Sequence, residues 1–252
     1  MPWGDVESLI PVFKEIKRLL GQPPSDDPQF HMSARHVKSN TEKIALVEDI
    51  IIEMYSGQGG GMSSSRNREK MWVEFLTSES SLFSDVDEDQ DAPFDADYTF
   101  QSQEYGVSYI SHKSIGWGGG GLALTWGNND PPKRREFESP IFILNYRKPT
   151  KGLWGGIKQG VYLIPLDFCK SQDDRVVRPG SIPGKRRHNR SDNVIPPNLV
   201  VDMLKHAEEN SLFFPIPYKR HAGRSLSLPF WNGVLPIIQG THTKTPDLDD
   251  WD

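Results

Sequence analysis

An aspartate and a lysine stand in two short stretches of alternating residues, and their types and spacing suit them to act together on a ligand. Residues 97–101 and 107–113 alternate on either side of a turn. Because successive side chains of a strand point to opposite faces, Asp97, Ser111 and Lys113 are expected on one face. A carboxylate and an ammonium group that meet in this way form either an ordinary cross-strand ion pair or a site where both charges act on one ligand.

The pairing of these two segments determines how close the groups come. Opposed residues of an antiparallel pair have numbers with a constant sum. If Gln101 pairs with Val107, Asp97 lies opposite Ser111, and Lys113 follows two residues later on the same face. We therefore predict a β-hairpin that presents the carboxylate and the lysine on one surface.

These residues resemble the motif of the PD-(D/E)xK nucleases, in which an Asp on one strand faces an acidic-x-Lys tripeptide on the next. The matching residues are Asp97, or Asp95 after Pro93-Phe94, and the tripeptide Ser111-His112-Lys113. Serine stands where the second acid is usual. Some type II restriction endonucleases of the family have this Ser-x-Lys form and take the missing carboxylate from elsewhere.

The resemblance implies a Mg²⁺ site. Mg²⁺ prefers hard oxygen ligands and keeps several waters, so Asp97, the main-chain carbonyl near His112 and a second acid would suffice. Several family members supply that acid from an N-terminal helix, and Glu48 and Glu53 are the candidates. Lys113 would orient or help deprotonate the attacking water and screen the charge on the phosphate. The expected catalytic residues are Asp97, Ser111, Lys113 and Glu48.

Charge is distributed unevenly along the 252 residues, whose formal net charge is −5. Residues 1–132 carry 10 Lys and Arg against 21 Asp and Glu, whereas residues 133–252 carry 19 against 13. A basic half favours a phosphate-rich partner such as double-stranded DNA, although solubilising surface is an equal alternative. The expected DNA-binding residues, of which the last three are candidates for reading guanine edges, are Lys133, Arg134, Arg135, Arg147, Lys185, Arg186, Arg187 and Arg190.

The elements that must hold these groups are predicted from periodicity and turn residues. Helices are expected over 5–20, after the capping box Ser39-Asn40-Thr41-Glu42, and from Pro197. The segments 57–65 and 84–97 are expected to be loops, and 71–76 a helix or a strand. Short apolar segments predict strands at 98–101, 107–115, 122–126, 141–146, 161–168, 212–218, 225–231 and 234–239. We expect an α+β (mixed α/β) fold with a central mixed sheet flanked by helices, and the resemblance implies a restriction-endonuclease-like core.

Composition bounds the organisation of the chain. We expect one catalytic domain over 1–244, with a helical N-terminal part at 1–56 and a β-rich core and basic half at 70–240, followed by an acidic tail at 245–252. Apolar runs fall short of the about 18 residues that a membrane-spanning helix needs. A single cysteine excludes an intramolecular disulfide. A cytoplasmic protein without a membrane partner is expected.

The resemblance implies a Mg²⁺-dependent, sequence-specific endonuclease of the type II restriction class. A homodimer is expected, because one site cuts one strand and a palindrome calls for two-fold symmetry. Two other functions stay open: a non-catalytic module that binds nucleic acid or carbohydrate through tryptophans and the Gly-rich stretch 116–121, and an interaction protein without a site. Neither depends on Lys113. The absence of a Walker A loop and of a G-x-S-x-G motif disfavours P-loop enzymes and serine hydrolases.

Overall fold

The computed structural model describes residues 4–23, 39–45, 62–86, 93, 96–115, 124–126, 136–146, 152–177 and 193–216. Its α-helices are α1 (Val6–Gly21), α3 (Met62–Glu79), α4 (Leu166–Ser171) and α5 (Pro197–Glu209), and residues 40–45 are also helical. Short 3-10 helices occur at η2 (Gly152–Trp154) and η3 (Asp173–Arg175). The strands are β1 (Phe83–Asp85), β2 (Tyr98–Ser102), β3 (Gly106–Ile115), β4 (Leu124–Trp126), β5 (Ile141–Asn145), β6 (Gly160–Ile164), β7 (Asn193–Ile195) and β8 (Phe213–Pro215).

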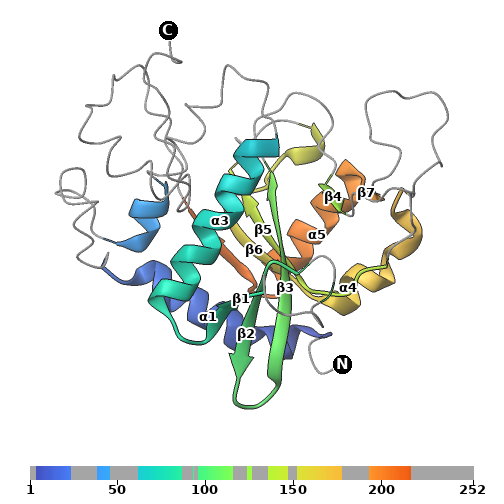
Figure 1. The fold of residues 1–252 in the computed structure, drawn as a ribbon. Helices are drawn as coiled ribbons and strands as arrows, with labels where there is room; N and C mark the ends of the chain where they lie inside the picture. Colours follow the sequence, from blue (N-terminus) through green and yellow to red (C-terminus); the bar gives the residue numbers. More distant parts are fainter. Residues whose placement is uncertain are drawn as a thin grey trace, which may run out of the picture.

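The described strands form a six-stranded sheet with the order β1-β2-β3-β5-β6-β8, and β4 pairs with β7 separately (Figure 1). β3 and β5 are parallel, whereas the other neighbours in the large sheet are antiparallel. The predicted fold class, a central mixed sheet flanked by helices, is confirmed.

Helices cover both faces of this sheet. The Trp72 ring of α3 packs on Phe142 of β5, with 5.1 Å between ring centroids. Phe142 is opposed by Leu163 on β6, so these two residues share a face and the neighbouring Tyr162 points to the other one. Tyr162 donates a hydrogen bond to Glu208 of α5. α3 and α5 therefore lie on opposite faces, and α1 lies beside α3 (Figure 1).

The β2–β3 hairpin has the predicted register, with Gln101 opposite Val107. One face of β2 is buried through Tyr98 and Phe100, while Gln101 is exposed. The turn is closed by Gly106, whose φ of 78° is a conformation that favours glycine. Alternation in the sequence thus specifies the register, because a slip of one residue would turn the buried aromatic rings to solvent.

Polar contacts at both ends of α1 hold this N-terminal helix in place. Asp5 caps the helix, since the Ser8 N–H donates to Asp5 Oδ1 at 2.8 Å. At the other end the Asn40 side chain donates to the Leu19 carbonyl at 2.9 Å and Thr41 Oγ1 to the Leu20 carbonyl at 2.6 Å. These bonds satisfy carbonyls that a helix end leaves without intrahelical partners.

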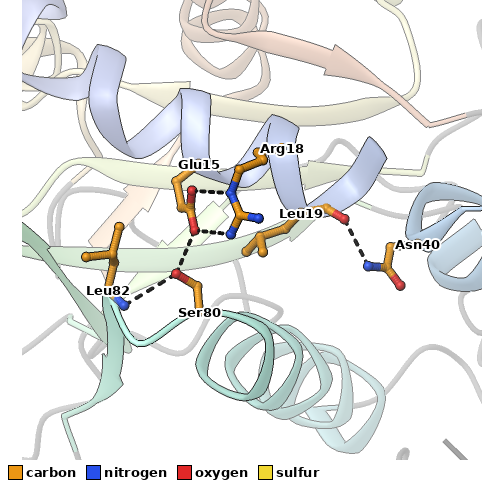
Figure 2. Close-up of polar contacts among 6 residues, drawn as sticks. All are labelled: Glu15, Arg18, Leu19, Asn40, Ser80 and Leu82. Carbon is orange, nitrogen blue, oxygen red and sulfur yellow. Dashed lines mark hydrogen bonds and ion pairs between the residues drawn. The ribbon is translucent and has the colours of Figure 1, made fainter. Parts of the chain in front are cut away.

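A second set of contacts ties α1 to the turn between α3 and β1. Figure 2 shows Ser80 between the carboxylate of Glu15 and the backbone of Leu82. Ser80 Oγ donates to Glu15 Oε1 at 2.6 Å, and the Arg18 guanidinium donates to both oxygens of the same carboxylate. The hydrogen bond from Arg18 is the main cause of the lowered pKa of Glu15. The carboxylate thus holds α1 and α3 in one arrangement.

Some element boundaries differ from those predicted. α3 begins at Met62, so residues 62–65 belong to a helix rather than to a loop, and 71–76 continues the same helix. β1, at Phe83–Asp85, overlaps the start of the stretch 84–97 that was expected to be a loop. The strand predicted at 161–168 ends at Ile164, because Pro165 has no N–H for the strand ladder and instead precedes the first turn of α4.

Other predictions fall outside the described residues. They are the strands at 225–231 and 234–239 and the acidic tail at 245–252. Within the described part of the chain, no helix combines the length and the hydrophobicity needed to cross a membrane.

Candidate active site

The carboxylate of Asp97 lies where the pairing of β2 with β3 ends. That pairing ends at Tyr98 and Ile110, and the Asp97 N–H continues it with a bond of 2.9 Å to the Ile110 carbonyl. Beyond this point β3 pairs with β5, starting at Ser111. The Asp97 side chain accepts a hydrogen bond from the His112 N–H. If strand pairing continued at this point, the His112 N–H would bond to the backbone of a neighbouring strand. Here the Asp97 carboxylate accepts that hydrogen bond instead.

The ammonium group of Lys113 lies beside this carboxylate. Lys113 Nζ is 4.0 Å from Asp97 Oδ2, and the two side chains are 17% and 19% exposed. Nζ also donates to Ser111 Oγ at 2.8 Å and to the His112 carbonyl at 3.0 Å. The predicted convergence of Asp97, Ser111 and Lys113 is thus present in the structure, and the Asp97 and Lys113 side chains are partly exposed.

A second carboxyl group, Glu69 of α3, forms a hydrogen bond with Asp97. Glu69 is half-buried and lies one helical turn before Trp72, which packs on the sheet. Residues three apart share a helix face, so the packing that buries Trp72 also directs Glu69 to the sheet. Sequence reasoning missed Glu69, because residues 66–70 lie between the expected loop at 57–65 and the expected element at 71–76 and were assigned to neither. With the correct helix boundary, the spacing of three residues between Glu69 and Trp72 would have indicated that both side chains lie on one face of the helix.

Burial raises the pKa of Asp97. The charge of Lys113 is the largest opposing influence, followed by the His112 N–H and the hydrogen bond with Glu69, while the charge of Asp85 adds to the rise. Burial disfavours the charged form of a carboxylate, and a bound cation would offset that cost. The pair of Asp97 and Glu69 therefore has the electrostatics of a site that favours a bound cation. We call Glu69, Asp97, Ser111, His112 and Lys113 the carboxylate–lysine site.

His112 contributes its backbone and not its ring to this site. Its side chain is 3% exposed and stacks on Phe142, with 5.1 Å between ring centroids. The ring Nε2 lies 3.3 Å from Ser114 Oγ on the same face. The expected metal ligand at this position, the main-chain carbonyl, accepts the Lys113 ammonium instead.

Most of the other predicted site residues lie outside the described part of the chain. These are Glu48, Glu53, Asp95 and the basic residues Lys133, Arg134, Arg135, Arg147, Lys185, Arg186, Arg187 and Arg190. Among the residues that are described, no three or more His, Cys, Asp and Glu side chains are grouped so as to hold a metal ion. The candidate ligands in the described part are therefore the carboxyl pair of Asp97 and Glu69.

Comparisons with known proteins give one structural likeness. No protein-family model and no curated protein matches the chain. Among solved structures, a restriction endonuclease in complex with substrate DNA matches 85% of this chain and 100% of its own, with 14% sequence identity and a TM-score of 0.48.

Proposed function

We propose that this protein is a Mg²⁺-dependent, sequence-specific endonuclease that hydrolyses phosphodiester bonds of double-stranded DNA. The observation that carries the proposal is the meeting of two carboxyl groups and one ammonium group, from three different elements, in the carboxylate–lysine site. A buried carboxylate with a raised pKa and a second acid in contact with it favour a cation. The ammonium beside them favours an anion. Together they suit a phosphate group bound through a divalent metal.

The donor set fits Mg²⁺. In phosphate-transferring sites this ion is usually held by one or two carboxylates, substrate phosphate oxygens and waters. Asp97 and Glu69 would supply the carboxylates, and the His112 carbonyl stays bonded to the Lys113 ammonium. When bound, the cation supplies Lewis-acid polarisation of the phosphate and lowers the pKa of a water molecule. Glu69 thus fills the role that the sequence assigned to Glu48 or Glu53.

The side chains of the site have separate roles in the reaction. Water forms a bond from its oxygen to phosphorus while one ester P–O bond breaks; the water loses a proton to solvent, and the departing sugar oxygen takes one up. Lys113 orients the water and offsets the negative charge that grows on the phosphate oxygens. Asp97 would hold the cation through its carboxylate, whose Oδ2 lies 4.0 Å from the Lys113 ammonium.

Binding to DNA is proposed to use the basic half of the chain. Phosphate contacts would come from Lys133 to Arg135 and from Arg147, and base contacts from residues Lys185 to Arg190. A homodimer with one catalytic domain over 1–244 in each copy would cut both strands of a palindromic site.

The test is cleavage of a large unmethylated phage DNA with Mg²⁺, compared with the same reaction in EDTA. The wild-type protein is expected to give discrete bands only with the metal. Lys113→Ala should lose them, because the positioned lysine contributes about 10²- to 10⁴-fold. The matched control is Lys170→Ala, which removes an exposed lysine of α4 and should cleave normally.

Two outcomes would contradict the proposal. One is the absence of cleavage by folded wild-type protein with Mg²⁺ or Mn²⁺, which would favour a non-catalytic binding module. The other is cleavage that survives in Lys113→Ala, which would make Asp97 and Lys113 an ordinary ion pair.

A further inference from the structure

The ammonium of Lys113 is held by oxygen atoms of its own strand. Nζ lies 2.8 Å from Ser111 Oγ and 3.0 Å from the His112 carbonyl, while Asp97 Oδ2 is farther away at 4.0 Å. Neutral acceptors therefore direct the ammonium more closely than its carboxylate neighbour does. This arrangement leaves the Asp97 carboxylate able to bind a cation without releasing the lysine.

Ser111 is itself rigidly placed. It is 0% exposed, its backbone N–H donates to the Pro140 carbonyl at 2.9 Å, and it opens the pairing of β3 with β5. Two residues advance a strand by about 6.6 Å, so the Lys113 side chain must fold back along β3 to reach the serine hydroxyl. The position of that hydroxyl thus sets the position of Nζ.

We propose that Ser111 is a positioning residue that holds the Lys113 ammonium in its working place. The inference rests on the proposed nuclease function and refines it. A lysine side chain has large rotamer freedom, and a buried acceptor at one end of its reach removes much of this freedom before the substrate binds. The serine is then no metal ligand. Glu69 serves as the second acid, and Ser111 holds the ammonium group of Lys113.

The first measurement is the single-turnover rate of DNA cleavage with Mg²⁺. Ser111→Ala should lower this rate about 10- to 100-fold, the effect of losing one hydrogen bond to a charged group. Ser111→Thr, which keeps the hydroxyl, should restore most of the rate. The matched control is Ser108→Ala on the same strand: Ser108 is 1% exposed, and its hydroxyl has no hydrogen-bond partner among the described residues. It should cleave as the wild type does.

Two further measurements do not depend on cleavage. Acylation of the Lys113 amine, followed by peptide mass spectrometry, should be several-fold faster in Ser111→Ala than in Ser108→Ala, because the amine is no longer held. Calorimetric binding of Ca²⁺ should be unchanged in Ser111→Ala and weakened in Glu69→Gln. Near-UV circular dichroism confirms that each variant is folded.

Distinct results overturn the inference and the proposed function. Unchanged cleavage and unchanged acylation in Ser111→Ala would overturn the positioning role. Loss of Ca²⁺ binding in Ser111→Ala to the same extent as in Glu69→Gln would make the serine a ligand. If the wild-type protein does not cleave DNA, the proposed function fails, and the acylation rates alone decide whether Ser111 holds Lys113.

Discussion

In the described part of the chain, two lysine–carboxylate groups lie beside the large sheet, and they differ in how the charges are paired. The second group, the Tyr162 cluster, consists of Lys158, Tyr162, Glu208 and Phe213. There Lys158 Nζ lies 3.2 Å from Glu208 Oε2 and 5.4 Å from the centre of the Phe213 ring. In the carboxylate–lysine site the corresponding distance is 4.0 Å. One group has a closed ion pair, whereas the other keeps its charges apart.

In the Tyr162 cluster, hydrogen bonds of the Tyr162 hydroxyl add to the ion pair between Lys158 and Glu208. The Tyr162 hydroxyl donates to the Lys158 carbonyl at 2.6 Å and to Glu208 Oε1 at 3.1 Å. Burial, followed by the charge of Glu208, raises the pKa of Tyr162 well above its ordinary value. The hydroxyl is therefore a permanent donor at any physiological pH. Such a cluster joins β6 to α5.

The carboxylate–lysine site is different, because burial affects the pKa of Asp97 more than the charge of Lys113 does. Burial is the largest influence on the pKa of Asp97 and raises it, although Lys113, the His112 N–H and Glu69 oppose the rise. The difference shows that a lysine next to an acid is not in itself a sign of function. A candidate site is distinguished by a buried charge that nearby groups compensate only in part, because a ligand can then supply the opposite charge.

The largest effect that we predict is on cleavage by Glu69→Gln. The variant should lose at least about 100-fold in single-turnover rate, because a metal ion supplies several kcal/mol of transition-state stabilisation. Glu74→Gln makes the same change at an exposed position of α3 and should retain the wild-type rate. Equal rates in the two variants would show that Glu69 has no part in the carboxylate–lysine site. The contrast between this site and the Tyr162 cluster would then be lost.

Tyr162→Phe should reduce stability and leave cleavage unchanged. The expected loss is about 1–3 kcal/mol in the free energy of unfolding, because the Glu208 carboxylate and the Lys158 carbonyl lose a buried donor. Urea unfolding measures the first quantity and the single-turnover rate the second. A large fall in cleavage by folded Tyr162→Phe would mean that the Tyr162 cluster is coupled to catalysis.

Asp97→Asn should change the pH dependence of stability. Because the pKa of Asp97 is raised in the folded state, its protonated form is favoured there; this contribution is complete below the ordinary value of 3.8 and is lost as the pH rises through the raised pKa. Asparagine stays neutral, so the variant should match the wild type in acid and exceed it increasingly towards neutral pH. Urea unfolding at a series of pH values checks this. A constant difference would contradict it.

The smallest effect is expected for Lys158→Ala. The lysine side chain is 62% exposed, and exposed ion pairs contribute about 0–1 kcal/mol. Thermal unfolding should therefore change little, and cleavage should not change. Since Lys113→Ala removes the same charge from the same sheet, the two variants together separate a local role from a general effect of charge. A fall in cleavage as large as that in Lys113→Ala would contradict the local role.

The sequence by itself determined the elements that depend on local pattern. The face that β2 and β3 bury follows from alternation, since a slip of one residue would turn the rings of Tyr98 and Phe100 to solvent. The same alternation placed Asp97 and Lys113 near each other. The start of α1 was predictable because its cap is a bond between residues three apart.

Only the tertiary structure decided which acid joins Asp97 and which acid neutralises Lys158. Glu69 reaches Asp97 because Trp72 packs α3 on the sheet, and Lys158 and Glu208 are 50 positions apart in the chain. Periodicity shows that a helix has a buried face, but many helix positions on a sheet would bury that face equally well. The choice among them depends on the fit of particular side chains, such as Trp72 against Phe142, and that fit exists only in the folded protein.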